Sequence, residues 1–268
     1  MAALDAVADW PAVAAVTVTD ADRTLASVGP GDPFPWASVT KLVTALTVLS
    51  AVDRGEAGLD EPAGPPGATL RHLLAHASGL APDGDTVLSP PGRRRIYSNR
   101  GIEVAAQLVE HRTGIAFDTL VRERVLDPLG MSATVLAGSP AHGARGPVRD
   151  LAALGRELLA PTLVPGLLAE ATRPAFPGLA GVLPGFGRQD PNDWGLGFEI
   201  RGAKNPHWTG ARNSAGTFGH YGQSGSFLWV DPVGGLACAG LADRPFGDWA
   251  VRVWPALSDA VLAEFTRR

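Results

Sequence analysis

The chain has 268 residues, of which 45% are hydrophobic and 19% charged, and its formal net charge is -4. This length can bury a sizeable core, as one large domain or as two interleaved ones. There is no basic stripe for nucleic acid, and no run approaches the roughly 18 unbroken apolar residues of a membrane span. We therefore expect a soluble protein that binds neither nucleic acid nor membrane.

The amino-terminal segment, MAALDAVADWPAVAAV, has no basic residue ahead of its apolar ones, and Asp5 and Asp9 interrupt the apolar run. Both features are atypical of a secretory signal peptide. The single cysteine, Cys238, has no partner for an internal disulfide, and its apolar setting GGLACAGLA favours a small buried residue. The expected compartment is the cytoplasm.

Two β-rich runs, 13–19 and 25–28, flank the polar turn DADRT and predict an amino-terminal hairpin. After the breakers GPGDPFP, the segment WASVTKLVTALTVLSAVDRG is apolar nearly all round over 42–52 and ends at Gly55. This pattern predicts a buried central helix with a glycine C-cap. Ser38 should lie at or just before the first turn of that helix.

Residues 56 to about 170 are mainly helical patterns: LRHLLAHASG, NRGIEVAAQLVEHRTG, FDTLVRERVLDPLGM and VRDLAALGRELLA. From about residue 193 the pattern changes to WGLGFEIRG, GTFGHYG, SGSFLWVDP and GLACAGLAD, which fit antiparallel strands. The final segment, WAVRVWPALSDAVLAEFTRR, predicts a helix that Pro255 interrupts and that covers one face of the sheet.

These elements predict an α+β fold, an α/β sandwich in which helices flank an antiparallel sheet. Residues 1–55 and 190–268 would form a discontinuous sheet domain, and residues 56–189 a mainly helical insert. We expect the active-site cleft between the two parts, because ligand sites form preferentially at such junctions.

The motif SVTK places Ser38 and Lys41 on one helical face, with Cβ atoms about 5–6 Å apart. An amine beside a hydroxyl can assist its deprotonation, which makes Ser38 a candidate nucleophile. The pKa of free lysine is near 10.4, so burial and positive neighbours must lower it by roughly 3 units before Lys41 can act as a base. Otherwise Lys41 stays charged and assists a second base. The motif alone is weak evidence, because this spacing also occurs by chance.

The triplet YSN supplies two possible partners for this pair. Tyr97 offers a phenol that can relay protons, and Asn99 offers an amide that can bind a substrate carbonyl. The structural alternative is a loop before a helix, with Asn99 as the N-cap.

The segment HYGQSGSFLWVDP contains the end of a predicted strand, with His220, Tyr221 and Gly222. Gly222 would let a substrate approach the backbone closely, and the amide of Gln223 could pair with that of Ser38 as an oxyanion hole. A glycine in a strand can also mark only a bulge.

Six motifs occur in order: SVTK, LRHLLAHASGL, PPGRRRIYSN, LDPLGM, WGLGF and GHYGQSGSFLWVDP. Together they resemble the class C β-lactamase family, which includes DD-peptidases, esterases and D-amino-acid amidases. The resemblance spans about residues 34–232 and implies a β-lactamase/transpeptidase-like fold. It further implies that Ser38 is acylated, that Tyr97 and Lys41 form the acid/base pair, and that Asn99 positions the substrate.

Two positions depart from that family's usual pattern. His220 matches the basic residue of the third motif, which is lysine in true class C β-lactamases and histidine in DD-peptidases and several hydrolases. Tyr221 replaces a small hydroxyl residue that commonly contacts the carboxylate of a penicillin or peptide. The resemblance therefore implies catalysis but lowers the expectation of an efficient β-lactamase.

His72 and His76 lie one helical turn apart, yet they form no HExxH motif and have no evident third ligand, so we expect no metal site. The resemblance implies instead that His76 anchors the loop carrying Ser78 and Gly79.

Arg93–Arg95 precede the tyrosine motif and either attract an anionic substrate group or form a solvated loop, which is favoured. Trp194, Trp208 and Trp229 either line an acyl pocket or pack in the core, and core packing is favoured for Trp229.

The sequence thus predicts a serine hydrolase that forms an acyl-enzyme on Ser38 and hydrolyses an ester, amide or β-lactam bond without a cofactor. Its expected partner is the small-molecule substrate; the oligomeric state is not predicted. The alternative is a non-catalytic protein of the same fold that binds β-lactams or peptidoglycan fragments or acts as a sensor. The intact SxxK and YxN motifs argue against that alternative.

Overall fold

The computed structural model describes residues 2–266, and its centre is a six-stranded antiparallel sheet that joins the two ends of the chain. The first hairpin of the sheet was predicted, and β1 pairs along its length with β11. In sheet order the strands are β2 (Thr24–Val28), β1 (Ala14–Thr19), β11 (Leu236–Ala242), β10 (Ser226–Asp231), β9 (Phe218–Gly222) and β8 (Glu199–Ile200).

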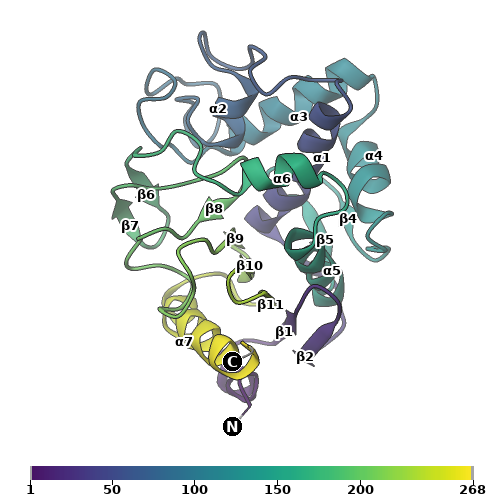
Figure 1. The fold of residues 1–268 in the computed structure, drawn as a ribbon, viewed down its shortest axis with the longest axis vertical. Helices are drawn as coiled ribbons and strands as arrows, with labels where there is room; N and C mark the ends of the chain where they lie inside the picture. The colour runs from purple at the N-terminus through teal and green to yellow at the C-terminus, as the bar shows by residue number, and fades with distance from the viewer. Residues whose placement is uncertain (1, 267–268) are drawn as a thin grey trace.

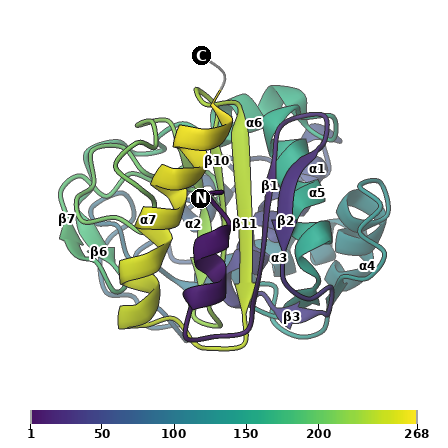
Figure 2. The same ribbon diagram turned by 90° about the horizontal axis from the view of Figure 1, so that it is seen from below.

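Helices cover both faces of the sheet, so the predicted α/β sandwich is confirmed. Figure 2 shows α7 (Asp248–Phe265) running across one face beside the short 3₁₀ helix at Asp5–Asp9. Alternate residues of β10 serve the two layers, because successive side chains of a strand point to opposite faces. Phe227 and Trp229 belong to the core under α7, whereas Leu228 belongs to the core on the opposite face.

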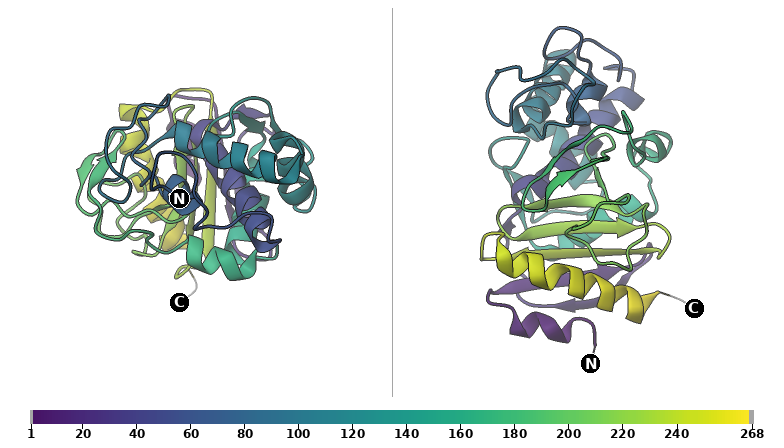
Figure 3. Two further views of the ribbon diagram at one scale, coloured as in Figure 1. Left: turned by 90° about the horizontal axis from the view of Figure 1, so that it is seen from above. Right: turned by 90° about the vertical axis from the view of Figure 1, so that its left-hand side faces the viewer.

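The helices between the two halves of the sheet lie mostly at the end of the molecule opposite the termini (Figures 1 and 3). The central helix α1 is buried through most of its length, as its sequence predicted, and Gly55 follows it in the left-handed conformation. The helices are α1 (Thr40–Asp53), α2 (Leu70–Leu74), α3 (Asn99–Thr113), α4 (Phe117–Val121, continuing as a π-helix over Arg122–Leu126), α5 (Val148–Leu159) and α6 (Pro165–Ala171).

Two helices and two small sheets differ from the prediction. Helix α2 ends after one and a half turns, and His76 beyond it has a left-handed φ of 53°. Helix α7 is continuous through Pro255, although the proline costs it one backbone hydrogen bond. Its buried side chains, among them Trp254 and Val261, hold it on the sheet. Two small sheets were not predicted: β3 (Phe34–Pro35), β5 (Ala144–Gly146) and β4 (Val135–Leu136), and the hairpin of β6 (Gly181–Leu183) and β7 (Gly187–Gln189).

The division into a sheet domain and a helical insert stays a prediction. One helix of the expected insert, α5, packs directly against β1, β10 and β11. Every helix within residues 2–266 is too short or too polar to cross a bilayer.

Candidate active site

Ser38 lies in a 3₁₀ turn, Ala37–Val39, that leads directly into α1, as the sequence predicted. Ala37 has a left-handed φ of 44°, a conformation that costs a non-glycine residue free energy. The surrounding structure holds the turn in place: the indole of Trp36 donates to the carbonyl of Gly146 at 3.0 Å, and the Ser226 hydroxyl donates to the carbonyl of Trp36 at 2.6 Å. The nucleophile is therefore carried on a constrained segment.

Lys41 is fully buried, and its ammonium group has three acceptors. Its Nζ lies 3.3 Å from Ser38 Oγ, 2.7 Å from Asn99 Oδ1 and 2.9 Å from the carbonyl of Ala141. Burial lowers the pKa of Lys41 to about 7, although the charges of Asp83 and Glu103 oppose the shift. A neutral amine has two hydrogens for Asn99 and Ala141, which leaves its lone pair toward Ser38.

Tyr97 approaches Ser38 from another element, the loop before α3. Its hydroxyl donates to Ser38 Oγ at 2.8 Å, and its ring lies 4.7 Å from Lys41 Nζ. Burial raises the pKa of Tyr97, so the phenol is protonated at neutral pH. Because Ser38 Oγ accepts from Tyr97, its own hydrogen is available for donation to neutral Lys41.

Asn99 is the first residue of α3 and not its N-cap. The N-cap is Ser98, whose Oγ accepts from the amide of Gly101 at 3.0 Å, so the predicted cap was wrong by one residue. The Asn99 side chain is held at both ends, by Lys41 Nζ and by Asp83 Oδ1, to which its Nδ2 donates at 3.1 Å.

His76 contacts the backbone and the aromatic ring of the tyrosine motif. Its Nδ1 accepts from the amide of Ser98 at 3.1 Å, and its ring centroid lies 4.6 Å from that of Tyr97 and 4.6 Å from that of Trp194. The side chain therefore orients the segment that carries Tyr97. His72 lies in a separate environment, where Nδ1 is 2.9 Å from Thr69 Oγ1. No group of three or more potential metal ligands occurs within residues 2–266.

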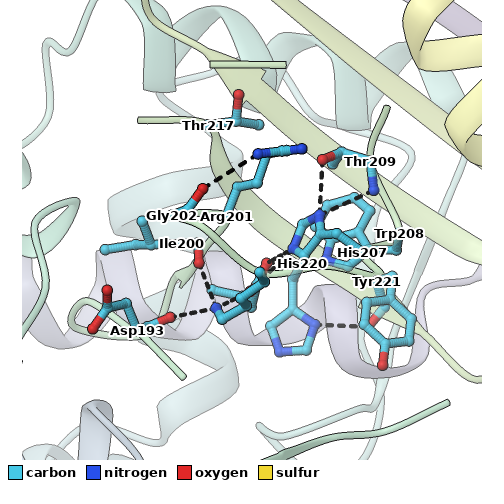
Figure 4. Close-up of polar contacts among 12 residues, drawn as sticks. Asp193, Ile200, Arg201, Gly202, His207, Trp208, Thr209, Thr217, His220 and Tyr221 are labelled. Atoms are coloured by element: carbon cyan, nitrogen blue, oxygen red, sulfur yellow. Dashed lines mark hydrogen bonds and ion pairs between the residues drawn. The ribbon is translucent and has the colours of Figure 1, made fainter. Parts of the chain in front are cut away.

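His220 lies in the middle of β9 and lines the same pocket as Ser38, but it is not the cation of the third motif. Its Nδ1 lies 2.6 Å from the carbonyl of Tyr221 (Figure 4), and because a carbonyl only accepts, Nδ1 carries the hydrogen. Burial lowers the pKa of His220 to about 3, and Lys41 adds to the shift. His220 is therefore neutral, and its buried Nε2 is an acceptor without a protein partner within residues 2–266.

The hydroxyl group of Tyr221 already has a protein partner and is not available to bind a substrate carboxylate. It donates to the carbonyl of Pro184 in the turn of the β6–β7 hairpin. The ring packs edge-on against Phe186 and belongs to the aromatic core under α7. The phenol therefore shapes the wall of the site, while its hydrogen is already used.

Gly222 allows a close approach of the backbone segment that carries Ser38. A Cβ at this position would lie 2.5 Å from the carbonyl of Trp36 and 3.0 Å from Ala37 Cβ. Approach of a substrate to Gly222 stays a prediction. The next residue, Gln223, is exposed, and neither its amide nor that of Ser38 donates to a protein acceptor within residues 2–266.

Ser38 opens into a small pocket of about 40 Å³. Four predicted residues besides Ser38 line it, and Lys41 and Asn99 lie behind Ser38 and Tyr97. The lining consists of Ser38, Tyr97, Leu183, Pro184, Trp194, Glu199, His220, Tyr221 and Gln223. Trp194 thus lines the pocket, whereas Trp229 is in the core as predicted, and so is Cys238.

The sequence did not indicate three residues of this pocket, Leu183, Pro184 and Glu199, and of these Glu199 alone is ionisable. Its buried carboxylate accepts from Lys204 Nζ, from His207 Nε2 at 3.0 Å and from the Trp208 indole at 2.9 Å. Burial alone would raise the pKa of Glu199, but Lys204 and His207 hold it well below the usual range. Lys204 also donates to the carbonyls of Asp193 and Ile200. The only sequence signal was a glutamate in a strand-like, otherwise apolar run.

The arginine run divides into two environments. Arg95 is buried and donates to the carbonyls of Asn192 at 3.0 Å and Ala175 at 2.8 Å, so it holds loops together. Arg93 and Arg94 are exposed. The expectation of a solvated run was therefore wrong for Arg95, because several backbone carbonyls converge on its guanidinium group.

Comparison with known proteins identifies relatives of this chain. The family model described as Beta-lactamase matches residues 1–262. The crystal structure of a β-lactamase from Mycobacterium bovis is 52% identical, with a TM-score of 0.97 over 99% of this chain and 100% of that chain.

Two curated relatives match in part. Penicillin-binding protein 4 of Amycolatopsis lactamdurans is 29% identical over 46% of this chain and 41% of its own length. The D-alanyl-D-alanine-carboxypeptidase/endopeptidase AmpH of Escherichia coli is 27% identical over 39% of this chain and 37% of its own. The chain thus spans about two fifths of the length of these relatives.

Proposed function

Because the chain belongs to the β-lactamase family, we propose that it is a serine hydrolase that forms an acyl-enzyme on Ser38. One observation carries the proposal: Ser38 Oγ lies within hydrogen-bonding distance of both Lys41 Nζ and Tyr97 Oη. A hydroxyl flanked by a near-neutral amine and a protonated phenol has a base for attack and an acid for the leaving group.

The reaction follows from these contacts. Ser38 Oγ forms a bond to the substrate carbonyl carbon while its proton passes to neutral Lys41. The amides of Ser38 and Gln223 stabilise the negative oxygen that develops. The bond to the leaving group then breaks, Tyr97 gives its proton to the departing atom, and Lys41 returns a proton to Tyr97. Water cleaves the acyl-enzyme by the same steps in reverse order.

The walls of the Ser38 pocket favour the neutral acyl group of an ester or amide and offer no binding site for a carboxylate. His220 is neutral, the Tyr221 hydroxyl is bonded to Pro184, and the only charged side chain that lines the pocket within the described residues is the Glu199 carboxylate. A carboxylate in the pocket would meet no cation and one anion. The 52% identity to the Mycobacterium bovis β-lactamase favours the second candidate, hydrolysis of a β-lactam.

Intact-protein mass spectrometry after brief exposure to p-nitrophenyl acetate or to a penicillin tests the proposal. We expect an acyl adduct or turnover that is lost in Ser38→Ala and kept in the control Ser132→Ala, an exposed serine outside the pocket. The preferred reagent separates the two substrate classes. Unchanged turnover by Ser38→Ala would remove Ser38 as the nucleophile, and no adduct with either reagent would favour a binding protein.

A further inference from the structure

A groove of about 370 Å³ adjoins the Ser38 pocket. Tyr97 and Pro184 line both hollows, so the two lie next to each other on either side of these residues. One wall of the groove is the loop that precedes α3, with Leu88, Arg94 and Ile96. The other is the hairpin of β6 and β7, with Val182 and Arg188.

The two hollows differ in size by enough to divide a substrate between them. On one and the same measure the pocket at Ser38 has a volume of about 40 Å³ and the groove a volume of about 370 Å³, so the pocket is much the smaller of the two. A bulky part of an ester or amide is therefore better accommodated in the groove. The groove, at about 370 Å³, is large enough for a ring or a short chain.

The groove has an apolar lining that is open to solvent. Leu88 exposes 53% of its surface and Val182 exposes 61%. Bulky apolar side chains that remain exposed around a hollow are typical of a ligand-binding surface, because their burial by a ligand is favourable.

Cationic side chains lie on the same groove. Arg94 is exposed and has no ion pair or hydrogen bond within residues 2–266, while Arg188 lies 3.1 Å from the exposed carboxylate of Asp190. The nearby acidic residues of the loop, Asp83 and Asp85, are bonded to Asn99 and Arg100. A free guanidinium group therefore faces a ligand in the groove and favours an anionic oxygen.

The position of Tyr97 identifies which part of the substrate lies there. In the proposed reaction Tyr97 protonates the leaving group, so the leaving group lies beside Tyr97, and Tyr97 lines the groove. Resting on the proposed function, we infer that this groove binds the leaving group of the substrate and selects an apolar alcohol or amine that bears a carboxylate. The carboxylate would lie near Arg94.

A pair of acetyl esters tests this inference: 4-acetoxybenzoate, whose leaving group is an anionic phenol, and its neutral methyl ester. The readout is the ratio of kcat/KM for the anionic ester to that for the neutral ester, compared between variants so that intrinsic reactivity cancels. We expect Arg94→Gln to lower the ratio about threefold to tenfold, because one charge-assisted contact is lost at a partly exposed site. The matched control, Arg93→Gln, removes a neighbouring exposed charge that does not line the groove and leaves the ratio unchanged.

Two further measurements complete the test. Arg94→Gln/Arg188→Gln should also remove most of the salt dependence of the ratio, since exposed charges are screened by salt. An equal ratio in wild type and Arg94→Gln, or an equal fall in Arg93→Gln, would overturn the inference. Loss of Ser38-dependent turnover of the neutral ester would instead overturn the proposed function, and so the two failures are distinguishable.

Discussion

The two buried lysines, Lys41 beside Ser38 and Lys204 beside Glu199, lie in different electrostatic environments. Lys41 on α1 is in contact with neutral acceptors only, and burial lowers its pKa to about 7. Lys204, in the loop after β8, forms an ion pair with Glu199, and both side chains are 1% exposed. Burial also lowers the pKa of Lys204, but the Glu199 charge opposes that shift.

Burial by itself does not make a lysine side chain a base. Lys41 has no carboxylate in contact, so the cost of desolvating its charge favours the neutral amine. Lys204 has a carboxylate in contact that is itself buried, so removal of either charge leaves the other unpaired. The first arrangement favours proton transfer, and the second fixes the wall of the pocket.

The largest expected effect comes from Lys41→Met. This variant should lose about 10²–10⁴-fold in kcat/KM for p-nitrophenyl acetate, because the proton acceptor for Ser38 is gone. Steady-state assays measure the loss, and urea unfolding should show a smaller change in stability than Lys204→Met. Retention of wild-type turnover would mean that Tyr97 or water is the base.

Lys204→Met should have the opposite balance of effects, with the larger change in stability. Glu199 would be left as a buried, less compensated charge, which costs about 3–5 kcal/mol of unfolding free energy. Urea unfolding followed by circular dichroism measures the cost. If Lys204→Met unfolds at the wild-type midpoint, the ion pair does not stabilise the pocket wall. The double variant Glu199→Gln/Lys204→Met should lose less unfolding free energy than the two single variants lose together.

The pH profile gives the smallest and most specific effect. The neutral form of Lys41 increases as pH rises through its pKa of about 7, so kcat/KM should rise with pH and level off above that value. Below it the rate should fall about tenfold per pH unit, as expected for loss of a single base. A flat profile between pH 5 and 8 would show that a charged Lys41 supports the reaction.

Much of the fold could be predicted from local pattern. The hairpin at 13–28, the buried helix after Ser38 and the strands β9 to β11 have apolar periodicities that match their burial. The β6–β7 hairpin could not, because its two short strands carry no alternating apolar pattern and, apart from one parallel bridge between Arg95 and Gly181, pair with each other. The groove that this hairpin lines therefore could not be predicted from the sequence.

The SVTK spacing by itself determined that Ser38 and Lys41 lie close together, because residues three apart on a helix share a face. The ordered motifs identified Tyr97 and Asn99 as candidate partners. Only the tertiary structure decided the chemical state of these groups. The acceptors of Lys41, the carbonyl that sets the His220 tautomer and the carbonyls around Arg95 come mostly from distant parts of the chain or from the local backbone. Desolvation and hydrogen bonding depend on that packing, which local spacing does not encode.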